Sequence, residues 1–371
     1  MHKYRLLSKK GEGTFSEVLK AQSIKSGKYV GIKCMKNHFD SVEQVNNLRE
    51  IQALRRLAGH PNIIKLHEVL YDEPTGRLAL VFELMDMNLY EAIKGRRHYL
   101  PDQKVRQYVY DLMRALDHMH RNGIFHRDVK PENLLLLDDE VKLADLGSCR
   151  GIYSRQPYTE YISTRWYRAP EVLCSWIDYT TAIDIWSIGC IFAEMLGRKP
   201  FFPGHNTQHQ LQLIISFLGT PRSEELRKIP NDKCRKFIES LPYSAGKPFE
   251  EVFSDASPSA NDFLNQTLQF DPDKRCTVAQ ALQRPYLAQL FCPEDEPTRP
   301  PLDTSDFEFE RRKINVKALR EELFLEVLHY YPEKREVYLQ EQARMEQQYS
   351  ISTFRLLAPG ESQYSSEEEQ A

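Results

Sequence analysis

The sequence lacks the features that mark secreted, zinc-binding and membrane-spanning proteins. Its seven cysteines are scattered, odd in number and never spaced as C-x-x-C, which argues against a disulfide framework or a zinc site. The N-terminus has no apolar signal core, and no stretch reaches transmembrane length. The most apolar segment, residues 183–196, is interrupted by Asp184 and Glu194 and predicts a buried helix. We therefore expect an intracellular, soluble protein.

The chain also lacks an excess of charge of either sign. A net charge of −3 gives no argument for binding to nucleic acid or to a membrane surface. A hydrophobic content of 41% excludes a wholly disordered chain. A length of 371 residues exceeds most single-core domains and predicts two lobes with additional material. We expect neither nucleic acid nor membrane among the partners.

A short polar stretch carries the strongest chemical signal. Residues 126–133 read His-Arg-Asp-Val-Lys-Pro-Glu-Asn and bring Asp128, Lys130 and Asn133 close together in the chain. A second carboxylate, Asp145, follows in Asp145-Leu146-Gly147. Such a loop can hold a hydroxyl, a phosphate and a divalent cation together. The alternative is a polar turn without chemistry, which would require the chain's other motifs to be accidents.

The N-terminal region predicts a glycine-containing hairpin followed by a strand lysine. Residues 4–36 alternate apolar and polar positions between turns, which predicts antiparallel strands. The stretch 11–18 reads Gly-Glu-Gly-Thr-Phe-Ser-Glu-Val, and its glycines would let backbone N–H groups approach phosphate oxygens. Lys33 ends the next predicted strand, 20 residues after Gly13. Taken alone, such a hairpin occurs in many folds, and a strand lysine is usually just solvated.

Helix and strand signals follow in order. A capping box of Ser41 and Gln44 opens a helix expected over about 42–58, and Glu50 lies beside its apolar stripe. A glutamate on a helix is usually a solvated charge. Two strands are expected around 66–71 and 78–84, and a helix with apolar positions from Val105 to Met119 should end at residues 122–123.

Together these motifs resemble those of eukaryotic serine/threonine protein kinases over about residues 4–286. The polar stretch matches the family's H-R-D-[LV]-K-P-x-N, and Asp-Leu-Gly matches its Asp-Phe-Gly with Leu146 in place of the aromatic residue. Residues 145–171 match the activation segment, which ends in Ala-Pro-Glu. Thr159-Glu160-Tyr161 and residues 164–171 resemble the MAP kinase and cyclin-dependent kinase group.

The resemblance implies an α+β, bilobal fold with a small β-rich N-lobe and a larger helical C-lobe. The N-lobe would span residues 4–84, the hinge 83–86 and the C-lobe 87–286, with an insert at about 219–260. Residues 287–371 would form a MAP-kinase-like C-terminal extension whose end is disordered. The segments 306–310 and 319–323 resemble the part of that extension that wraps back onto the small lobe. Residues 293–297 resemble an acidic docking patch, although Cys292 replaces one acidic position and a surface loop is the alternative interpretation.

The implied activity is transfer of the γ-phosphoryl group of ATP to serine or threonine hydroxyls of proteins, with ATP and Mg²⁺ as cofactors. Asp128 would orient the hydroxyl and accept its proton, and Lys130 would neutralise charge on the moving phosphoryl group. Asn133 and Asp145 would hold Mg²⁺, while Lys33, paired with Glu50, would reach the phosphates. The residues expected to contact or organise ATP are Lys10, Gly11, Glu12, Gly13, Thr14, Phe15, Ser16, Glu17, Val18, Gly31, Lys33, Glu50, Phe82, Glu83, Met85, Asn133 and Asp145. Phe82 would be the gatekeeper.

The same resemblance implies a phosphorylation switch and two structural contacts. A phosphate on Thr159 would meet Arg49, Arg127 and Arg150, and a phosphate on Tyr161 would meet Arg165 and Arg168. The alternative is that both phosphosites are ordinary exposed loop residues. Two contacts would be structural: Asp184 would hold the catalytic-loop backbone, and Arg275 would form a buried ion pair with Glu171.

Expected partners are protein substrates, an upstream kinase unless the protein phosphorylates itself, and the chaperone machinery. We expect a monomer in the cytoplasm, with nucleus and cilium as alternatives, and target residues followed by proline. A pseudokinase scaffold remains the alternative function. Three residues, Ser16, Gly31 and Leu146, differ from the family's motifs. These differences change packing but delete no charged group, which favours an active kinase over a pseudokinase. A small-molecule phosphotransferase on the same fold would lack the Ala-Pro-Glu segment.

Overall fold

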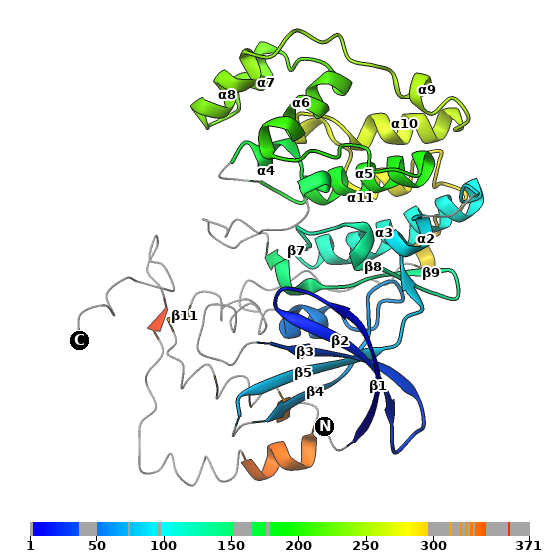
Figure 1. Cartoon of the computed structure of the whole chain (residues 1–371), viewed down its shortest axis with the longest axis vertical. Helices are drawn as coiled ribbons and strands as arrows, with labels where there is room; N and C mark the ends of the chain where they lie inside the picture. Colours follow the sequence, from blue (N-terminus) through cyan, green and yellow to red (C-terminus); the bar gives the residue numbers. More distant parts are fainter. Residues whose placement is uncertain are drawn as a thin grey trace. The chain divides into compact units, whose positions relative to one another are not determined.

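The chain folds into two units. The computed structural model describes residues 3–36, 50–72, 75–94, 98–151, 165–175, 179–295, 312–313, 320, 324, 327–328, 331–338 and 355–356. The first unit comprises Met1–Ala58, Ile64–Leu84 and Leu302–Ala371, and the second comprises Gly59–Ile63 and Met85–Pro301. The first is built on a β-sheet and the second is mainly helical (Figure 1). This confirms the predicted α+β fold with a small β-rich lobe and a larger helical lobe.

The first unit contains one five-stranded antiparallel sheet. Its strands are β1 (Tyr4–Glu12), β2 (Ser16–Ser23), β3 (Tyr29–Met35), β4 (Leu66–Asp72) and β5 (Arg77–Glu83), in the order β1-β2-β3-β5-β4. The strands expected within 4–36 and around 66–71 and 78–84 are therefore present. Side chains alternate between the two faces, because successive strand residues point in opposite directions. One face carries the apolar cluster Ala21, Val30, Ile32, Ala79 and Val81.

The other sheet face packs against a helix and against the C-terminal segment. Val69, Leu78 and Leu80 form a cluster with Ile51, which lies in the described helical residues 50–56. Val327, far along the chain, completes this cluster. The capping box expected to begin the helix lies outside the described residues. The C-terminal segment thus supplies part of the core of the first unit.

Short strands of the second unit frame the polar loop. β6 (Met87–Asn88), β8 (Leu134–Leu137) and β9 (Glu140–Leu143) form a three-stranded antiparallel sheet. β7 (Ile124–Phe125) pairs with β10 (Arg150–Gly151). The short 3₁₀ turns are η1 (Pro131–Asn133), η2 (Leu146–Ser148), η3 (Arg165–Tyr167), η4 (Pro272–Lys274) and η5 (Pro293–Asp295). A further strand pair, β11 (Arg312–Lys313) and β12 (Arg355–Leu356), belongs to the first unit.

The second unit contains mainly helices, one of which is buried along its length. They are α2 (Leu89–Ile93), α3 (Asp102–Arg121), α4 (Pro170–Leu173), α5 (Ala182–Gly197), α6 (Thr207–Leu218), α7 (Ser223–Arg227), α8 (Asp232–Glu239), α9 (Phe249–Val252), α10 (Pro258–Thr267) and α11 (Val278–Leu282). α5 is the predicted buried helix, and all its residues from Ile183 to Met195 are buried. Gly189 lies so close to Thr267 and Leu268 that a Cβ there would meet side-chain atoms at 2.7 Å. α3 begins about one turn before its apolar stripe and ends at Arg121, with Asn122 as its C-cap, close to the expected end.

The region expected as an insert, about 219–260, folds onto the second unit. It contains α7, α8, α9 and the beginning of α10. Phe217, Phe249 and Phe253 lie within ring-contact distance of Phe201. Aromatic rings in such contact add specific packing to the area they bury. Within the described part of the chain, no helix is both long and apolar enough to span a membrane, and all seven cysteines are free.

Candidate active site

Asp184 of α5 fixes the backbone of the polar loop. It is fully buried, and its carboxylate accepts hydrogen bonds at 2.9 Å from the backbone N–H groups of His126 and Arg127. Burial alone would raise the pKa of Asp184, but hydrogen bonds from His120 and His126 hold it below its ordinary value. Arg127 is thereby kept at a φ of 72°, a region that residues other than glycine rarely adopt. The predicted contact between Asp184 and the loop backbone is confirmed.

Asp128, Lys130 and Asn133 form one polar cluster. Lys130 Nζ donates to Asp128 Oδ2 at 2.7 Å, and Asn133 Nδ2 donates to the Asp128 main-chain oxygen at 2.9 Å. Asn133 Nδ2 also lies 3.3 Å from Asp128 Oδ2. The Asp128 N–H donates to His126 Nδ1 at 3.2 Å, while His126 Nε2 faces the carbonyl of Ala144 at 3.0 Å. This pattern suits a neutral His126 protonated on Nε2. The structure therefore brings the three predicted loop residues together.

A backbone hydrogen bond between Asn133 and Ala144 connects the polar cluster to Asp145. The N–H of Ala144 donates to the carbonyl of Asn133 at 2.9 Å, and Asp145 follows with left-handed φ and ψ of 61° and 65°. Since Asn133 Nδ2 is used by Asp128, the atom left to face a cation is Asn133 Oδ1. One carboxamide and one carboxylate oxygen fit Mg²⁺, which keeps several waters and binds phosphate oxygens. Among the described residues, no cluster of three His, Cys, Asp or Glu side chains could hold a metal by itself.

Leu146 replaces the expected aromatic residue without leaving an exposed side chain. It begins η2 and is fully buried. Its carbonyl accepts the N–H of Cys149 at 3.2 Å, which closes the turn after Asp145. The change is thus one of packing, and the carboxylate before it is retained.

Lys33 and Glu50 form an ion pair in the first unit. Lys33 lies on β3 opposite Val18 of β2 and Leu80 of β5. Its Nζ lies 2.7 and 2.9 Å from the two carboxylate oxygens of Glu50, whose side chain is 3% exposed. The ion pair that the sequence predicts is present. A helix glutamate this deeply buried is not the solvated charge of the alternative interpretation.

The glycine-containing hairpin closes with backbone and side-chain hydrogen bonds. Gly13 N–H donates to the carbonyl of Ser16 at 2.8 Å, and Lys36 Nζ donates to the carbonyl of Gly13 at 2.9 Å. Hydrogen bonds from Lys36 and Lys9 lower the pKa of Glu12 to about 2. Glu12 is thus ionised and paired. Phe15 at the tip is exposed.

Gly31 and the predicted hinge residues lie on and after neighbouring strands. Gly31 pairs with Phe82 of β5, and a Cβ on Gly31 would make only ordinary contact, at 3.7 Å, with the carbonyl of Glu83. Glu83 is anchored to Lys65: its carboxylate accepts the Lys65 N–H at 2.8 Å, and its own N–H donates to the Lys65 carbonyl at 3.2 Å. Met85, the first residue of the second unit after β5, is buried.

Three of the five predicted phosphate-binding arginines lie around a residue that the sequence reasoning missed. Arg127 Nη2 donates to the hydroxyl of Tyr179 at 2.8 Å. Burial raises the pKa of Tyr179, while the neighbouring Arg127, Arg150 and Arg168 oppose that rise. Arg168 therefore groups with Arg127 and Arg150, although the sequence assigned it to the other phosphosite. The only sequence signal for Tyr179 is an aromatic residue shortly before α5.

The remaining residues of the predicted switch are separate from this group or outside the described chain. Arg165 Nη1 donates to the carbonyl of His205 at 2.9 Å. Arg49, Thr159 and Tyr161 lie outside the described residues. Of the predicted docking patch, residues 293–295 form η5, and residues 296–297 lie outside the described chain. Of the predicted wrapping segments 306–310 and 319–323, Arg320 alone is described.

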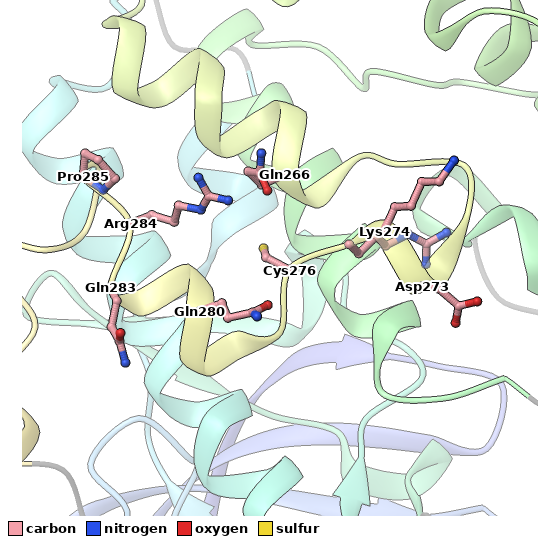
Figure 2. Close-up of a pocket in the computed structure, with 9 residues that line it drawn as sticks. Gln266, Asp273, Lys274, Cys276, Gln280, Gln283, Arg284 and Pro285 are labelled. Carbon is pink, nitrogen blue, oxygen red and sulfur yellow. The ribbon is translucent and has the colours of Figure 1, made fainter.

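A polar pocket elsewhere in the second unit is not the active site. It has a volume of about 610 Å³ and lies between the end of α10 and α11, with Gln266 and Gln280 on its walls (Figure 2). Its charged groups already have partners: Lys274 bonds to Glu225, and Arg284 lies 3.3 Å from Asp262. Among the described residues, none from the catalytic loop lines this pocket. We assign no chemistry to it.

Comparison with known proteins agrees with this geometry. A family model described as protein kinase domain matches residues 4–287. The MAPK/MAK/MRK overlapping kinase of Mus musculus is 52% identical over 286 residues, covering 77% of this chain and 68% of that protein. The Homo sapiens protein of the same name is 51% identical over 289 residues, covering 78% and 68%. Mitogen-activated protein kinase 12 of Oryza sativa subsp. japonica is 39% identical over 347 residues, covering 91% and 59%.

These relatives confirm the subgroup that the motifs predict. The mixture of Thr159-Glu160-Tyr161 with looser matches elsewhere predicts similarity to the MAPK/MAK/MRK overlapping kinase, and that similarity is found. A protein kinase uses ATP and acts on protein substrates. The chain therefore belongs to the protein kinase family, as a serine/threonine protein kinase of the MAP kinase and cyclin-dependent kinase group.

Proposed function

We propose that Asp128 orients the substrate hydroxyl and accepts its proton while the γ-phosphoryl group of ATP is transferred. The observation that carries this proposal is the cluster in which Lys130 Nζ lies 2.7 Å from Asp128 Oδ2. The ammonium group fixes the direction of the carboxylate, which would then face the substrate hydroxyl. The backbone under this cluster is held by the fully buried Asp184. Positioning of this kind is the main contribution that a protein makes to phosphoryl transfer.

Lys130 would have a second role once the substrate is bound. Its Nζ carries three N–H donors and donates one of them to Asp128. With substrate bound, the ammonium group would face the phosphoryl group, where negative charge must be stabilised during transfer. Because its side chain is only 15% exposed, this interaction is weakly screened by solvent.

Asn133 Oδ1 and the Asp145 carboxylate would hold Mg²⁺, and Lys33 would bind the phosphates of ATP. Bound Mg²⁺ would supply positive charge against the phosphate oxygens. Glu50 would keep the ammonium group of Lys33 in place, as its two contacts of 2.7 and 2.9 Å indicate. In the first unit, residues 11–18 and the hinge residues Phe82 and Glu83 would also contact ATP.

Catalysis is tested by phosphorylation of a generic protein substrate and of the kinase itself. Purified protein with ATP and Mg²⁺ should incorporate phosphate, and Asp145→Asn should abolish incorporation because it removes one charged metal ligand. Asp262→Asn is a matched control, since this half-exposed carboxylate lies outside the site, 3.3 Å from Arg284. A wild-type protein that binds ATP but transfers no phosphate, even after phosphorylation by an upstream kinase, would instead identify a pseudokinase scaffold.

We further propose that phosphorylation of Thr159 and Tyr161 activates the kinase. The support is the group of Arg127, Arg150 and Arg168, because a phosphate brings roughly −1.5 to −2 charges and strong acceptor oxygens. Arg127 directly precedes Asp128, so an anion bound there would order the catalytic loop. Thr159→Ala combined with Tyr161→Phe should lose most activity, whereas the neighbouring Tyr158→Phe should retain it. Full activity in the double variant would overturn the switch.

The target residue would be followed by proline. The support is the resemblance of residues 164–171 to the MAP kinase and cyclin-dependent kinase group, which implies this preference, together with Arg168. Two peptides that differ only in Ser-Pro against Ser-Ala provide the test. At least tenfold higher kcat/KM is expected for the proline peptide. Equal values would show that the resemblance does not extend to this specificity.

A further inference from the structure

One carboxylate of the first unit joins three distant parts of the chain. Glu68 lies on β4, which is the edge strand of the five-stranded sheet. Its carboxylate accepts hydrogen bonds from Lys3 Nζ and from the hydroxyl of Tyr331, and also from the hydroxyl of Tyr4 at 2.6 Å. Lys3 Nζ donates to the Tyr331 hydroxyl at 2.9 Å and lies 4.4 Å from the centre of the Tyr331 ring. We call Lys3, Glu68 and Tyr331 the edge clamp.

The edge clamp reaches around the edge of the sheet. Glu68 and Val69 are successive strand residues, so their side chains point to opposite faces. Val69 belongs to the apolar cluster around Ile51, and Tyr331 packs against this same cluster. Tyr4, which shares the Glu68 carboxylate, packs against the cluster of the other face. The C-terminal segment therefore lies on one face and is anchored by a hydroxyl that reaches across β4.

The carboxylate of the edge clamp is ionised and largely sheltered from solvent. The Glu68 side chain is 14% exposed. Burial alone would raise the pKa of Glu68, but hydrogen bonds from Lys3, Tyr331 and Tyr4 hold it below its ordinary value. Burial and the hydrogen bond to Glu68 raise the pKa of Tyr331, so its hydroxyl remains a donor. Hydrogen bonds to an ionised acceptor are stronger than those between neutral groups.

The segment that the edge clamp holds also supports the helix that carries Glu50. The Tyr331 N–H donates to the carbonyl three residues earlier at 2.9 Å, which ties it to the turn after Val327. Val327 is 7% exposed and completes the cluster around the fully buried Ile51. Ile51 directly follows Glu50, whose carboxylate oxygens lie 2.7 and 2.9 Å from Lys33 Nζ. Packing of Val327 on Ile51 therefore bears on the position of the ion pair.

We propose that Tyr331 is a positioning residue for the helix that carries Glu50. Its hydroxyl holds the C-terminal segment over β4 and keeps Val327 packed against Ile51, which in turn keeps Glu50 within reach of Lys33. Without the hydroxyl, the segment loses its charge-assisted anchor and leaves the sheet more often, and the helix opens more often with it. The consequence for nucleotide binding rests on the proposed role of Lys33 and Glu50.

The test is hydrogen exchange of the full-length protein, followed by mass spectrometry, in the wild type and in Tyr331→Phe. Phenylalanine keeps the ring and removes only the hydroxyl. Amides of residues 50–56 should exchange about tenfold faster, as loss of a hydrogen bond to an ionised acceptor predicts, while those of α5 should keep the wild-type rate. Tyr4→Phe is the matched control, because it removes the same atom from the same carboxylate but leaves the C-terminal segment anchored. It should exchange like the wild type over residues 50–56.

A conservative change at the acceptor gives a second check. Glu68→Gln retains an oxygen that can accept the Tyr331 hydroxyl, although without the charge, whereas Glu68→Ala retains no acceptor. Exchange over residues 50–56 should therefore be slower in Glu68→Gln than in Glu68→Ala. Equal rates in these two variants would overturn the edge clamp.

Binding of ATP with Mg²⁺ separates positioning from a general loss of stability. Tyr331→Phe should raise the Kd for ATP severalfold, while the KM for a peptide substrate at saturating ATP stays unchanged. In a Lys33→Met background, Tyr331→Phe should weaken ATP binding no further, because the edge clamp acts through that ion pair. Unchanged exchange over residues 50–56 in Tyr331→Phe, or a further loss of ATP binding in the Lys33→Met background, would overturn the proposal. Faster exchange with unchanged ATP binding would support the edge clamp and overturn the proposed role of Lys33 and Glu50.

Discussion

Replacement of Arg275 by methionine should strongly destabilise the second unit. The Arg275 guanidinium is enclosed: its side chain is 0% exposed, and that of its partner Glu171 is 1% exposed. Nη1 and Nη2 lie 2.6 and 2.7 Å from the two Glu171 oxygens. The other donors reach main-chain carbonyls, with Nε to Gln269 at 2.8 Å, Nη1 to Ala182 at 3.0 Å and Nη2 to Phe270 at 3.2 Å. All five N–H groups of the guanidinium are therefore used.

The magnitude follows from what Arg275→Met leaves behind. Glu171 would remain charged and buried without its partner, and removal of one member of a buried ion pair typically costs about 3–5 kcal/mol. For a unit of this size, each kcal/mol lowers the melting temperature by roughly 2–4 °C, so a fall on the order of 10 °C is expected. Arg275→Lys should also destabilise, because an ammonium group has three donors in place of a planar fork of five.

The assay is urea unfolding followed by near-UV circular dichroism, with differential scanning fluorimetry as a second measurement. Arg284→Met is the control, because Arg284 and Asp262 lie 3.3 Å apart with side chains 33% and 40% exposed. Exposed pairs of this kind contribute about 0–1 kcal/mol. Glu171→Leu combined with Arg275→Met should recover only part of the loss, since the main-chain carbonyls of Gln269, Ala182 and Phe270 would still lack donors. If Arg275→Met were as stable as Arg284→Met, the account of this ion pair would be refuted.

Three further predictions concern the first unit, the pH dependence and the hinge. Lys33→Met and Glu50→Ala should each reduce kcat/KM for ATP in steady-state kinetics. The double variant should be little worse than either single variant, because both changes break the same ion pair. Additive losses would contradict this. Burial raises the pKa of Asp111 from 3.8 to about 6, so the folded state binds a proton more tightly than the unfolded state and stability falls as pH rises from about 4 to 6. Urea unfolding at a series of pH values gives the free energy of unfolding as a function of pH. Asp111→Asn should remove up to about 3 kcal/mol of the change between about pH 4 and 6. An unchanged pH dependence in this variant would show that Asp111 is not its cause. Phe82→Gly should admit purine analogues with bulky substituents, and unchanged inhibition by such analogues would show that the hinge has been misplaced.

The parts of the molecule that follow from local sequence were predictable. Alternation in residues 4–36 and the apolar stripe of α3 are repeated signals, so several residues support each assignment. The residues from Asp128 to Asn133 are close in the chain, and a short loop must keep them close in space. The contacts of Asp184 and Arg275 are distant in sequence, yet they could be predicted because their motifs resemble those of a family.

Contacts that no periodic pattern or family motif in the sequence indicates were not predictable. Tyr179 reaches Arg127 through a single hydroxyl, and no periodicity indicates such a contact. Val327 completes the core around Ile51 only because the chain returns to the first unit. The placement of Arg168 with Arg127 and Arg150 depends on how the segment before α4 folds, and distances of this kind are set by tertiary structure.

The central claim is that Asp128 acts on the substrate hydroxyl and not on the nucleotide. Its most direct test compares Asp128→Asn with the wild type in two measurements on the same preparations: single-turnover phosphoryl transfer to a peptide and equilibrium binding of ATP with Mg²⁺. Asparagine keeps the shape but removes the charge that pairs with Lys130 Nζ at 2.7 Å. The account predicts that transfer falls by a factor of at least 100, about 2.7 kcal/mol in the barrier, while the Kd for ATP stays within about threefold. Transfer at near wild-type rate, or an equal loss in ATP binding, would contradict it.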